Sequence, residues 1–262
     1  MPSDLILKEA MLILKRPKLE NNAEELDYKI VEEVDHISSV GDALLCQILS
    51  FLSTKQAVRS SALSKRWKNV WTKTPVLDFS ECSDAGDKGS NFPCFASRVL
   101  IRNSTSRLKK LCFDDLLEFD LVHVNAWFSN LILRDIEEIC LYNRINDQPF
   151  DMCMMFLTRL HLVILKLCGG SISQLPILVK FSDLKVVHLT DVQSPNNSLN
   201  RLVAGCPVLE ELSVYNCRWP CVDIKSSTLK RLTVYYLVDS INQLLVRAPN
   251  LEQLSLLSLI HI

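Results

Sequence analysis

The sequence predicts a small all-helical unit followed by an α/β solenoid with a curved parallel sheet. Two patterns predict this fold class: apolar residues at helical spacing before residue 80, and a short apolar motif that recurs from residue 108 onward. With 48% hydrophobic and 23% charged residues, the chain has the composition of an ordinary folded protein. Its 262 residues suffice for one mid-sized domain and one small one.

Residues 1–34 are expected to form a flexible leader of mixed composition. A short apolar stretch, MPSDLILKEAMLILK, is interrupted by Asp4, Lys8 and Glu9, so it does not form the core of a signal peptide. The basic LKRPKL that follows is compatible with a nuclear import signal, but also with a solvated leader. The chain contains no run of about 18 uncharged apolar residues, so no membrane span is expected. We expect a cytoplasmic or nuclear protein.

Residues 35–80 are expected to fold as three short helices. Five apolar residues at helical spacing predict a first amphipathic helix that begins near Asp42: Leu44, Leu45, Ile48, Leu49 and Leu52. Thr54 is a suitable N-cap for a second helix, and Ser64 for a third helix that carries Trp67 and Trp71. Pro75 ends the helical region. Three helices this short bury little surface alone, so the unit requires a partner or a neighbouring domain.

Residues 81–104 are expected to form a linker. Their sequence, ECSDAGDKGSNFPCFASRVLIRNS, begins with turn-forming residues. We expect it to lead into a short helix near Phe95 to Ile101.

Residues 105–262 repeat a hexamer of the form apolar-x-x-apolar-x-apolar. It occurs seven times, as LKKLCF at Leu108, IEEICL at Ile136, LVILKL at Leu162, LKVVHL at Leu184, LEELSV at Leu209, LKRLTV at Leu229 and LEQLSL at Leu251. Successive hexamers start 28, 26, 22, 25, 20 and 22 residues apart. Leucine-rich repeats have periods of about 20–29 residues. The chain is therefore expected to contain about seven such repeats.

Each hexamer is expected to contain a short strand whose last two apolar residues point inward. The strands stack in parallel, with helices or irregular segments on the convex side. We expect SPNNSLNRLVAGCP and SINQLLVRAP to supply helical turns there. Among the positions that usually carry Asn or Cys after the strand, only Cys217 conforms, so irregular turns without one continuous polar ladder are expected. The apolar ending LSLIHI indicates a truncated repeat domain or a non-native tail.

Catalytic and metal chemistry find little support in the sequence. Phosphate-binding, nucleophile-elbow and zinc-protease motifs are missing, and the five histidines lie in unrelated contexts. Ten scattered cysteines suggest reduced thiols, and Cys217 and Cys221 are expected to be structural because further ligands at metal spacing are lacking. The formal charge of −1 gives no nucleic-acid footprint. We therefore expect no enzyme activity, no cofactor, no metal and no nucleic-acid partner.

The concave face of the predicted sheet is the expected site for a target protein. Solenoids bind partners on such faces because these are long and rigid. Tyrosine and arginine are favoured binding anchors, which singles out four outward residues as target-binding candidates: Tyr142, Tyr215, Arg231 and Tyr235. The alternative is that these are solvated strand residues without a partner.

The segment DHISSVGDALLCQILSFLSTKQAVRSSALSKRWKNVWTKTPVLDFS resembles the F-box of the large plant F-box/leucine-rich-repeat family, with its RNI-like, FBD-associated repeats. GCPVLEEL and APNLEQL are similar to that family's repeats. The resemblance implies an F-box that docks on the Skp-type adaptor of a cullin-based ubiquitin ligase. It implies that the repeats recruit a target protein for ubiquitination. The implied adaptor-facing residues are Ile37, Leu44, Leu45, Ile48, Leu49, Leu52, Val58, Leu63, Ser64 and Trp67.

One departure from the family pattern keeps a second function open. Val40 and Gly41 stand where the family usually has Leu-Pro, and proline there fixes the start of the first helix. Its loss is expected to free the backbone, at a cost of about 1 kcal/mol in adaptor binding. The alternative function is a non-ligase leucine-rich-repeat binding scaffold with a degenerate F-box.

Overall fold

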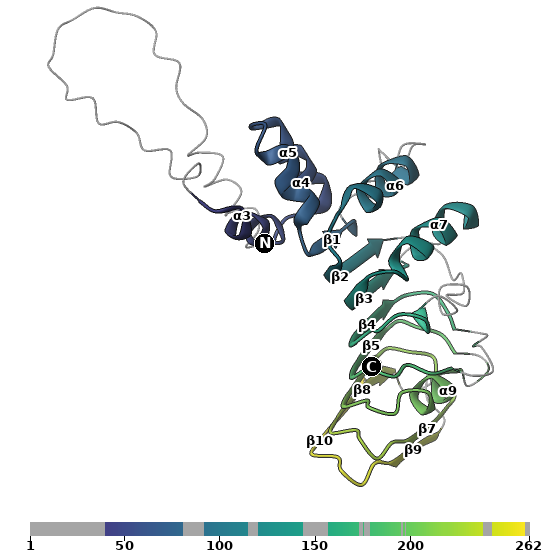
Figure 1. Cartoon of the computed structure of the whole chain (residues 1–262). Helices are drawn as coiled ribbons and strands as arrows, with labels where there is room; N and C mark the ends of the chain where they lie inside the picture. The colour runs from purple at the N-terminus through teal and green to yellow at the C-terminus, as the bar shows by residue number, and fades with distance from the viewer. Residues whose placement is uncertain are drawn as a thin grey trace, which may run out of the picture.

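The computed structural model describes residues 40–80, 92–114, 120–143, 157–172, 175, 179–194, 196, 198–237 and 243–259. A helical unit lies at one end of a long, curved parallel sheet, and further helices cover one side of that sheet (Figure 1). The predicted fold class, a small all-helical F-box unit followed by an α/β leucine-rich solenoid, is confirmed. None of the described helices is long and apolar enough to cross a membrane.

The helical unit contains the three predicted helices, α3 (Asp42–Leu49), α4 (Thr54–Arg59) and α5 (Trp67–Val70). Short 3₁₀ turns follow α4 at Ser60–Ala62 and α5 at Trp71–Lys73. The two predicted caps are wrong. Ser53 caps α4 in a reciprocal capping box with Gln56, so Thr54 is the first helical residue instead. Ser64 lies outside α5, whose N-cap position is Arg66.

The main sheet has eight parallel strands in the order β1-β2-β3-β4-β5-β6-β8-β10. All seven predicted hexamers contribute strands: β2 (Arg107–Asp114), β3 (Asp135–Tyr142), β4 (Ile164–Cys168), β5 (Val186–Thr190), β6 (Glu211–Tyr215), β8 (Arg231–Leu237) and β10 (Gln253–Leu259). The eighth, β1 (Val76–Asp78), comes from the end of the helical unit and pairs in parallel with β2. The helical unit is therefore joined to the solenoid by a shared sheet.

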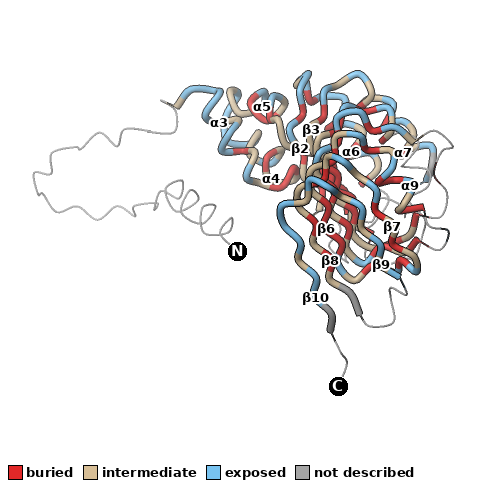
Figure 2. Tube along the Cα trace, turned by 90° about the horizontal axis from the view of Figure 1, so that it is seen from below, coloured by how far each residue is buried: buried red, intermediate tan, exposed pale blue. Residues whose placement is uncertain are grey.

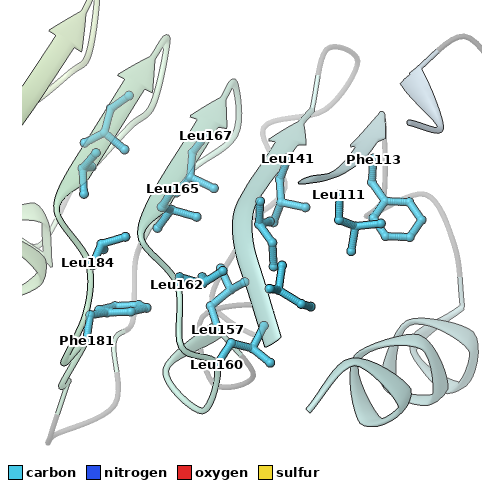
Figure 3. Packing of buried hydrophobic residues seen from close by; sticks show 14 of the residues in the cluster. Leu111, Phe113, Leu141, Leu157, Leu160, Leu162, Leu165, Leu167, Phe181 and Leu184 are labelled. Carbon is cyan, nitrogen blue, oxygen red and sulfur yellow. The ribbon is translucent and has the colours of Figure 1, made fainter. Parts of the chain in front are cut away.

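The core is a ladder of inward-pointing side chains from the fourth and sixth hexamer positions. In the first six hexamers these side chains are at most 1% exposed: Leu111, Phe113, Ile139, Leu141, Leu165, Leu167, Val187, Leu189, Leu212, Val214, Leu232 and Val234. Figure 3 shows several of them projecting to the same side of neighbouring strands. In β10, Leu254 and Leu256 hold the same positions but are 49% and 47% exposed. No described strand follows β10, which lies at the edge of the sheet (Figure 2).

Helices α6 (Phe92–Arg102), α7 (Leu121–Leu131) and α9 (Ser198–Ala204) cover the convex side (Figure 1). The helix predicted near Phe95 to Ile101 is α6, which is longer than expected at both ends. An aromatic stack joins the helical unit to the first repeats. The Phe113 ring lies 4.9 Å from Phe79 and 5.5 Å from Trp127 of α7, nearly parallel to both.

One convex segment differs from its predicted structure. SPNNSLNRLVAGCP contains the helix α9, as expected, but SINQLLVRAP contains the strand β9 (Gln243–Arg247). This strand pairs in parallel with β7 (Cys221–Lys225). Leu244 and Val246 alternate along β9 and pack against the core, which explains why an extended backbone prevails over a helix here.

The turns that follow the strands are more regular than predicted. The sequence predicted no continuous ladder of Asn or Cys side chains. Instead, backbone hydrogen bonds connect four of the described turns, one residue before the usual Asn or Cys position. The N–H groups of Asn143, Gly169, Asp191 and Asn216 each donate to a carbonyl of the following strand, at 2.7–2.9 Å. Three of these residues have positive φ: 75° at Gly169, 54° at Asp191 and 51° at Asn216. The repeating element is thus a left-handed turn.

Replacing Gly169 tests this turn. A Cβ atom there would lie 1.9 Å from the carbonyl oxygen of Asn143, in addition to the strain of positive φ. Gly169→Ala is expected to lower the free energy of unfolding by about 1–3 kcal/mol. Gly41→Ala is the matched control, because a Cβ at Gly41 meets no atom within 4 Å. Urea unfolding of both variants measures the effect, and equal stabilities would contradict it.

Candidate functional site

An apolar face of the helical unit is exposed. On α3 and the turn after it, Leu44, Ile48 and Phe51 are spaced four and three residues apart and therefore share one side of the helix. Leu63, which follows the 3₁₀ turn after α4, is also exposed. The exposed fractions are 52% for Leu44, 40% for Ile48, 68% for Phe51 and 50% for Leu63. A group of large apolar residues in water is typical of a protein-binding surface.

The structure separates the described adaptor-facing residues into three groups: exposed, half-buried and buried. Leu44, Ile48, Leu63 and Ser64 are exposed, while Leu52, Val58 and Trp67 are half-buried. The other two α3 leucines, Leu45 and Leu49, are 1% and 2% exposed, so we correct their assignment from adaptor contact to core packing. They lie about 100° around the helix from Leu44 and Ile48, on the adjacent side that faces the core.

Ile37 and Phe51 remain to be compared with the predicted adaptor-facing set. Ile37 lies outside the described residues. Phe51 was missed by the sequence reasoning, although its spacing of seven from Leu44 is a detectable signal. We define the α3 face as Leu44, Ile48 and Phe51.

The start of α3 is well defined despite the missing proline. Gly41, its N-cap, has φ −67°, which is the value that proline would impose. Arg66 holds this segment from the side: its guanidinium donates to the Val40 carbonyl and, at 2.8 Å, to the Asp42 carboxylate. These contacts offer a substitute for the missing proline, while the expected loss of adaptor affinity at Val40-Gly41 stays a prediction. In this chain Arg66 ties α5 to the N-terminus of α3.

Hydrogen bonds of two residues, Asn103 after α6 and Arg134 before β3, fix the helical unit on the sheet. The Asn103 side chain, 2% exposed, donates to the Thr74 carbonyl at 3.0 Å. Arg134 donates to the Asn103 side chain at 3.0 Å and to the Leu100 carbonyl at 2.6 Å. Burial lowers the pKa of the Arg134 guanidinium. The guanidinium is nevertheless the donor in both hydrogen bonds, as expected of a protonated arginine. Together with β1–β2 pairing, they orient the α3 face relative to the solenoid.

The concave face carries ion pairs between neighbouring strands. Lys166 lies 2.8 Å from Glu138, and Glu211 lies 2.9 Å from Arg231 and 3.6 Å from His188. Burial alone would raise the pKa of Glu138, but hydrogen bonds from Lys166 and Cys140 outweigh it and hold that pKa below its ordinary value. Burial also lowers the pKa of His188, an effect that Glu211 only partly offsets. Much of the charge on this face is therefore balanced internally.

Two of the four target-binding candidates lie together. Tyr215 on β6 and Tyr235 on β8 are paired in register, with ring centroids 6.4 Å apart. Arg231 also lies on β8, but four residues before Tyr235 and therefore about 13 Å along the strand, where it bonds Glu211. Tyr142 lies on β3, three strands from β6, so strand spacing alone separates it by about 14 Å. Burial raises the pKa of the Tyr142 phenol, which is half-buried.

The cysteines behave as packing residues. Cys112 and Cys140, side by side on β2 and β3, are buried although they point to the concave side. A hydrogen bond to Cys140 and burial raise the pKa of the Cys112 thiol. Burial raises the pKa of Cys217 to about 12, while Cys221 is half-buried. Within the described ranges, no three His, Cys, Asp or Glu side chains are grouped as metal ligands.

Comparison with known proteins agrees with this architecture. Residues 37–79 match the F-box domain, and residues 124–262 match the leucine-rich repeats of the FBD-associated F-box protein At5g56370 family. F-box/LRR-repeat protein 13 of Arabidopsis thaliana is 31% identical over 86% of this chain and 52% of its own length. F-box/FBD/LRR-repeat protein At5g22660 of the same plant is 35% identical over 69% of this chain and 40% of its own length.

These matches define the class as F-box proteins with leucine-rich repeats. The chain belongs to the F-box/leucine-rich-repeat family whose repeats are FBD-associated. It spans about half the length of the curated relatives it matches. No solved structure matches it.

Replacing Arg66 tests its role at the start of α3. Arg66→Met is expected to lower the free energy of unfolding by about 1 kcal/mol, because it removes a charge-assisted but partly exposed pair and a bond to the Val40 carbonyl. Adding Gly41→Pro should restore about 0.4–1 kcal/mol, since the backbone already has the φ of proline. Lys65→Met, an exposed neighbour, is the control. Equal urea midpoints for the Arg66 and Lys65 variants would refute this role.

Proposed function

We propose that this chain is a substrate-recognition subunit of a Skp–cullin–F-box ubiquitin ligase. Its F-box docks on a Skp-type adaptor, and through it on a cullin, while the repeats recruit a target protein for ubiquitination. The observation that carries the proposal is the α3 face: three large apolar side chains exposed on one side of the first F-box helix and the turn after it. A solvated unit gains nothing from exposing them, whereas a protein partner would bury them.

The proposed mechanism is proximity. The F-box holds the chain on the ligase, and the target held on the solenoid acquires a high effective concentration near the ubiquitin donor. This requires a stiff connection, which β1–β2 pairing and the Asn103–Thr74 hydrogen bond support. The proposal assigns the chain no catalytic residue, cofactor or metal, and it places the protein in the cytoplasm or nucleus.

The target surface in this proposal is the concave face around Tyr215, Arg231 and Tyr235. The two rings are adjacent and Tyr215 is exposed, so they offer a rigid aromatic contact. Tyr142 and Arg231 are each more than about 12 Å from this pair, so they would meet a target at separate points.

The second candidate is a non-ligase binding scaffold with a degenerate F-box. The observation that favours it is Gly41 in place of the family proline. Arg66 weakens the argument, because it holds Val40 and Asp42 in place without proline. We therefore place the ligase subunit first.

Charged substitutions on the α3 face test the adaptor contact. Leu44→Asp/Ile48→Asp is expected to weaken binding to a Skp-type adaptor about 100-fold, because it removes two apolar side chains from the interface and adds charges. The measurement is isothermal titration with the purified adaptor. Leu133→Asp, at a leucine that is 89% exposed after α7, is the matched control and should bind like the native chain.

Two results would count against the proposal. If the native chain remains folded by circular dichroism and does not bind the adaptor, the scaffold candidate replaces it. If the control loses binding as much as the α3 variant, the α3 face is not the contact.

A further inference from the structure

A groove lies where the F-box meets the first helix of the solenoid. It has a volume of about 610 Å³ and is lined by Val58, Ser61, Lys68, Asn69, Trp71, Thr72 and Arg102. We call it the junction groove. Trp71 is buried and Val58 half-buried, so the groove offers apolar contact, while Lys68 and Arg102 are exposed. The lining residues, all of them described, include two cations and no carboxylate.

The charge of this region differs from that of the whole chain. Residues 40–80 contain six Lys and Arg but only two Asp, although the complete chain has a formal charge of −1. One of those aspartates, Asp42, is paired with Arg66. Arg59, Lys65, Lys68 and Lys73 are all exposed. The F-box is therefore a basic unit on a nearly neutral protein, and its charge attracts an acidic ligand to the groove that Lys68 lines.

The two cations are placed by different parts of the chain. Lys68 belongs to α5 of the F-box, whereas Arg102 is the last residue of α6. Directly after α6, the Ser104 N–H donates to the Thr72 carbonyl at 2.8 Å. This bond fixes the C-terminus of α6 against the 3₁₀ turn of the F-box. The groove is thus a preformed feature that exists only when F-box and solenoid are joined.

We propose that the junction groove binds an acidic segment of the Skp-type adaptor. This inference rests on the proposed function. The groove includes Val58, one of the residues that the family resemblance assigns to the adaptor contact, and its two cations suit an acidic partner. Carboxylates of the segment pair with Lys68 and Arg102, and its aliphatic stems lie on Val58 and Trp71. The solenoid thereby contributes a residue, Arg102, to adaptor binding.

Charge reversal in the groove tests the inference. The affinity of the whole chain for the purified adaptor is measured by titration at two salt concentrations. Charge interactions are strong at about 50 mM salt and largely screened at about 500 mM salt. Lys68→Glu/Arg102→Glu is expected to bind about tenfold more weakly at low salt and within about twofold of native at high salt. Lys180→Glu/Arg159→Glu makes the same charge change at exposed sites outside the groove. It should match the native chain to within about twofold.

A second probe separates failure of the groove from failure of the ligase function. A fluorescent oligoglutamate peptide should bind the native chain and the control double variant, and bind the groove variant at least about tenfold more weakly. If the native chain does not bind the adaptor, the proposed function fails and the assignment to an adaptor segment fails with it. The peptide then decides whether the groove recognises acidic polypeptides.

Two further outcomes would overturn the inference while the proposed function stands. The first is adaptor affinity that is equal in the groove and control variants. The second is tighter binding of a labelled single-stranded RNA than of the peptide, lost in the groove variant, which would assign the groove to nucleic acid.

Discussion

Each repeat buries its two inward side chains only against its neighbours, and the remaining structure depends on this constraint. Leu165 and Leu167 of β4, for example, are covered by the strands on both sides. A solenoid therefore requires something at its first strand to close the ladder. The F-box supplies it: Leu77 of β1 lies beside Leu111, and the Phe79 ring stacks on Phe113, both with 1% exposure or less. The F-box thus acts as the N-terminal cap of the repeats, in addition to the docking role proposed for it.

This shared role divides the surfaces of the F-box. One side is used within the chain, where Leu45, Leu49 and Trp71 enter the common core. The adjacent side of α3 is left with large apolar residues in water. Arg66 connects the start of α5 to the start of α3, so the start of α3 is defined by a side-chain contact instead of a proline. Because the cap and the docking face belong to one unit, an adaptor bound there would have a fixed orientation relative to the concave face.

Periodicity predicted most of the fold and only part of the site. All seven hexamers form strands, because alternation of buried apolar residues is a local pattern that sequence displays directly. β9 was predicted as helical, since its extended form depends on pairing with β7, a contact between distant segments. Leu45 and Leu49 were assigned to the adaptor face because family resemblance does not tell which side of a helix the chain itself uses. The junction groove was not foreseen, because Arg102 reaches it only through the Ser104–Thr72 hydrogen bond.

Hydrogen–deuterium exchange of the chain, alone and with a purified Skp-type adaptor, tests the central claim most directly. The account predicts slow exchange in β1 and β2 in both states, because the F-box is part of the sheet. It predicts that the adaptor slows exchange in peptides covering Leu44 to Leu63, with little change over β6 and β8. Rapid exchange in β1 beside a protected β2 would show that the F-box is not fixed on the sheet. Protection confined to β6 and β8 would contradict the assignment of the adaptor to the α3 face.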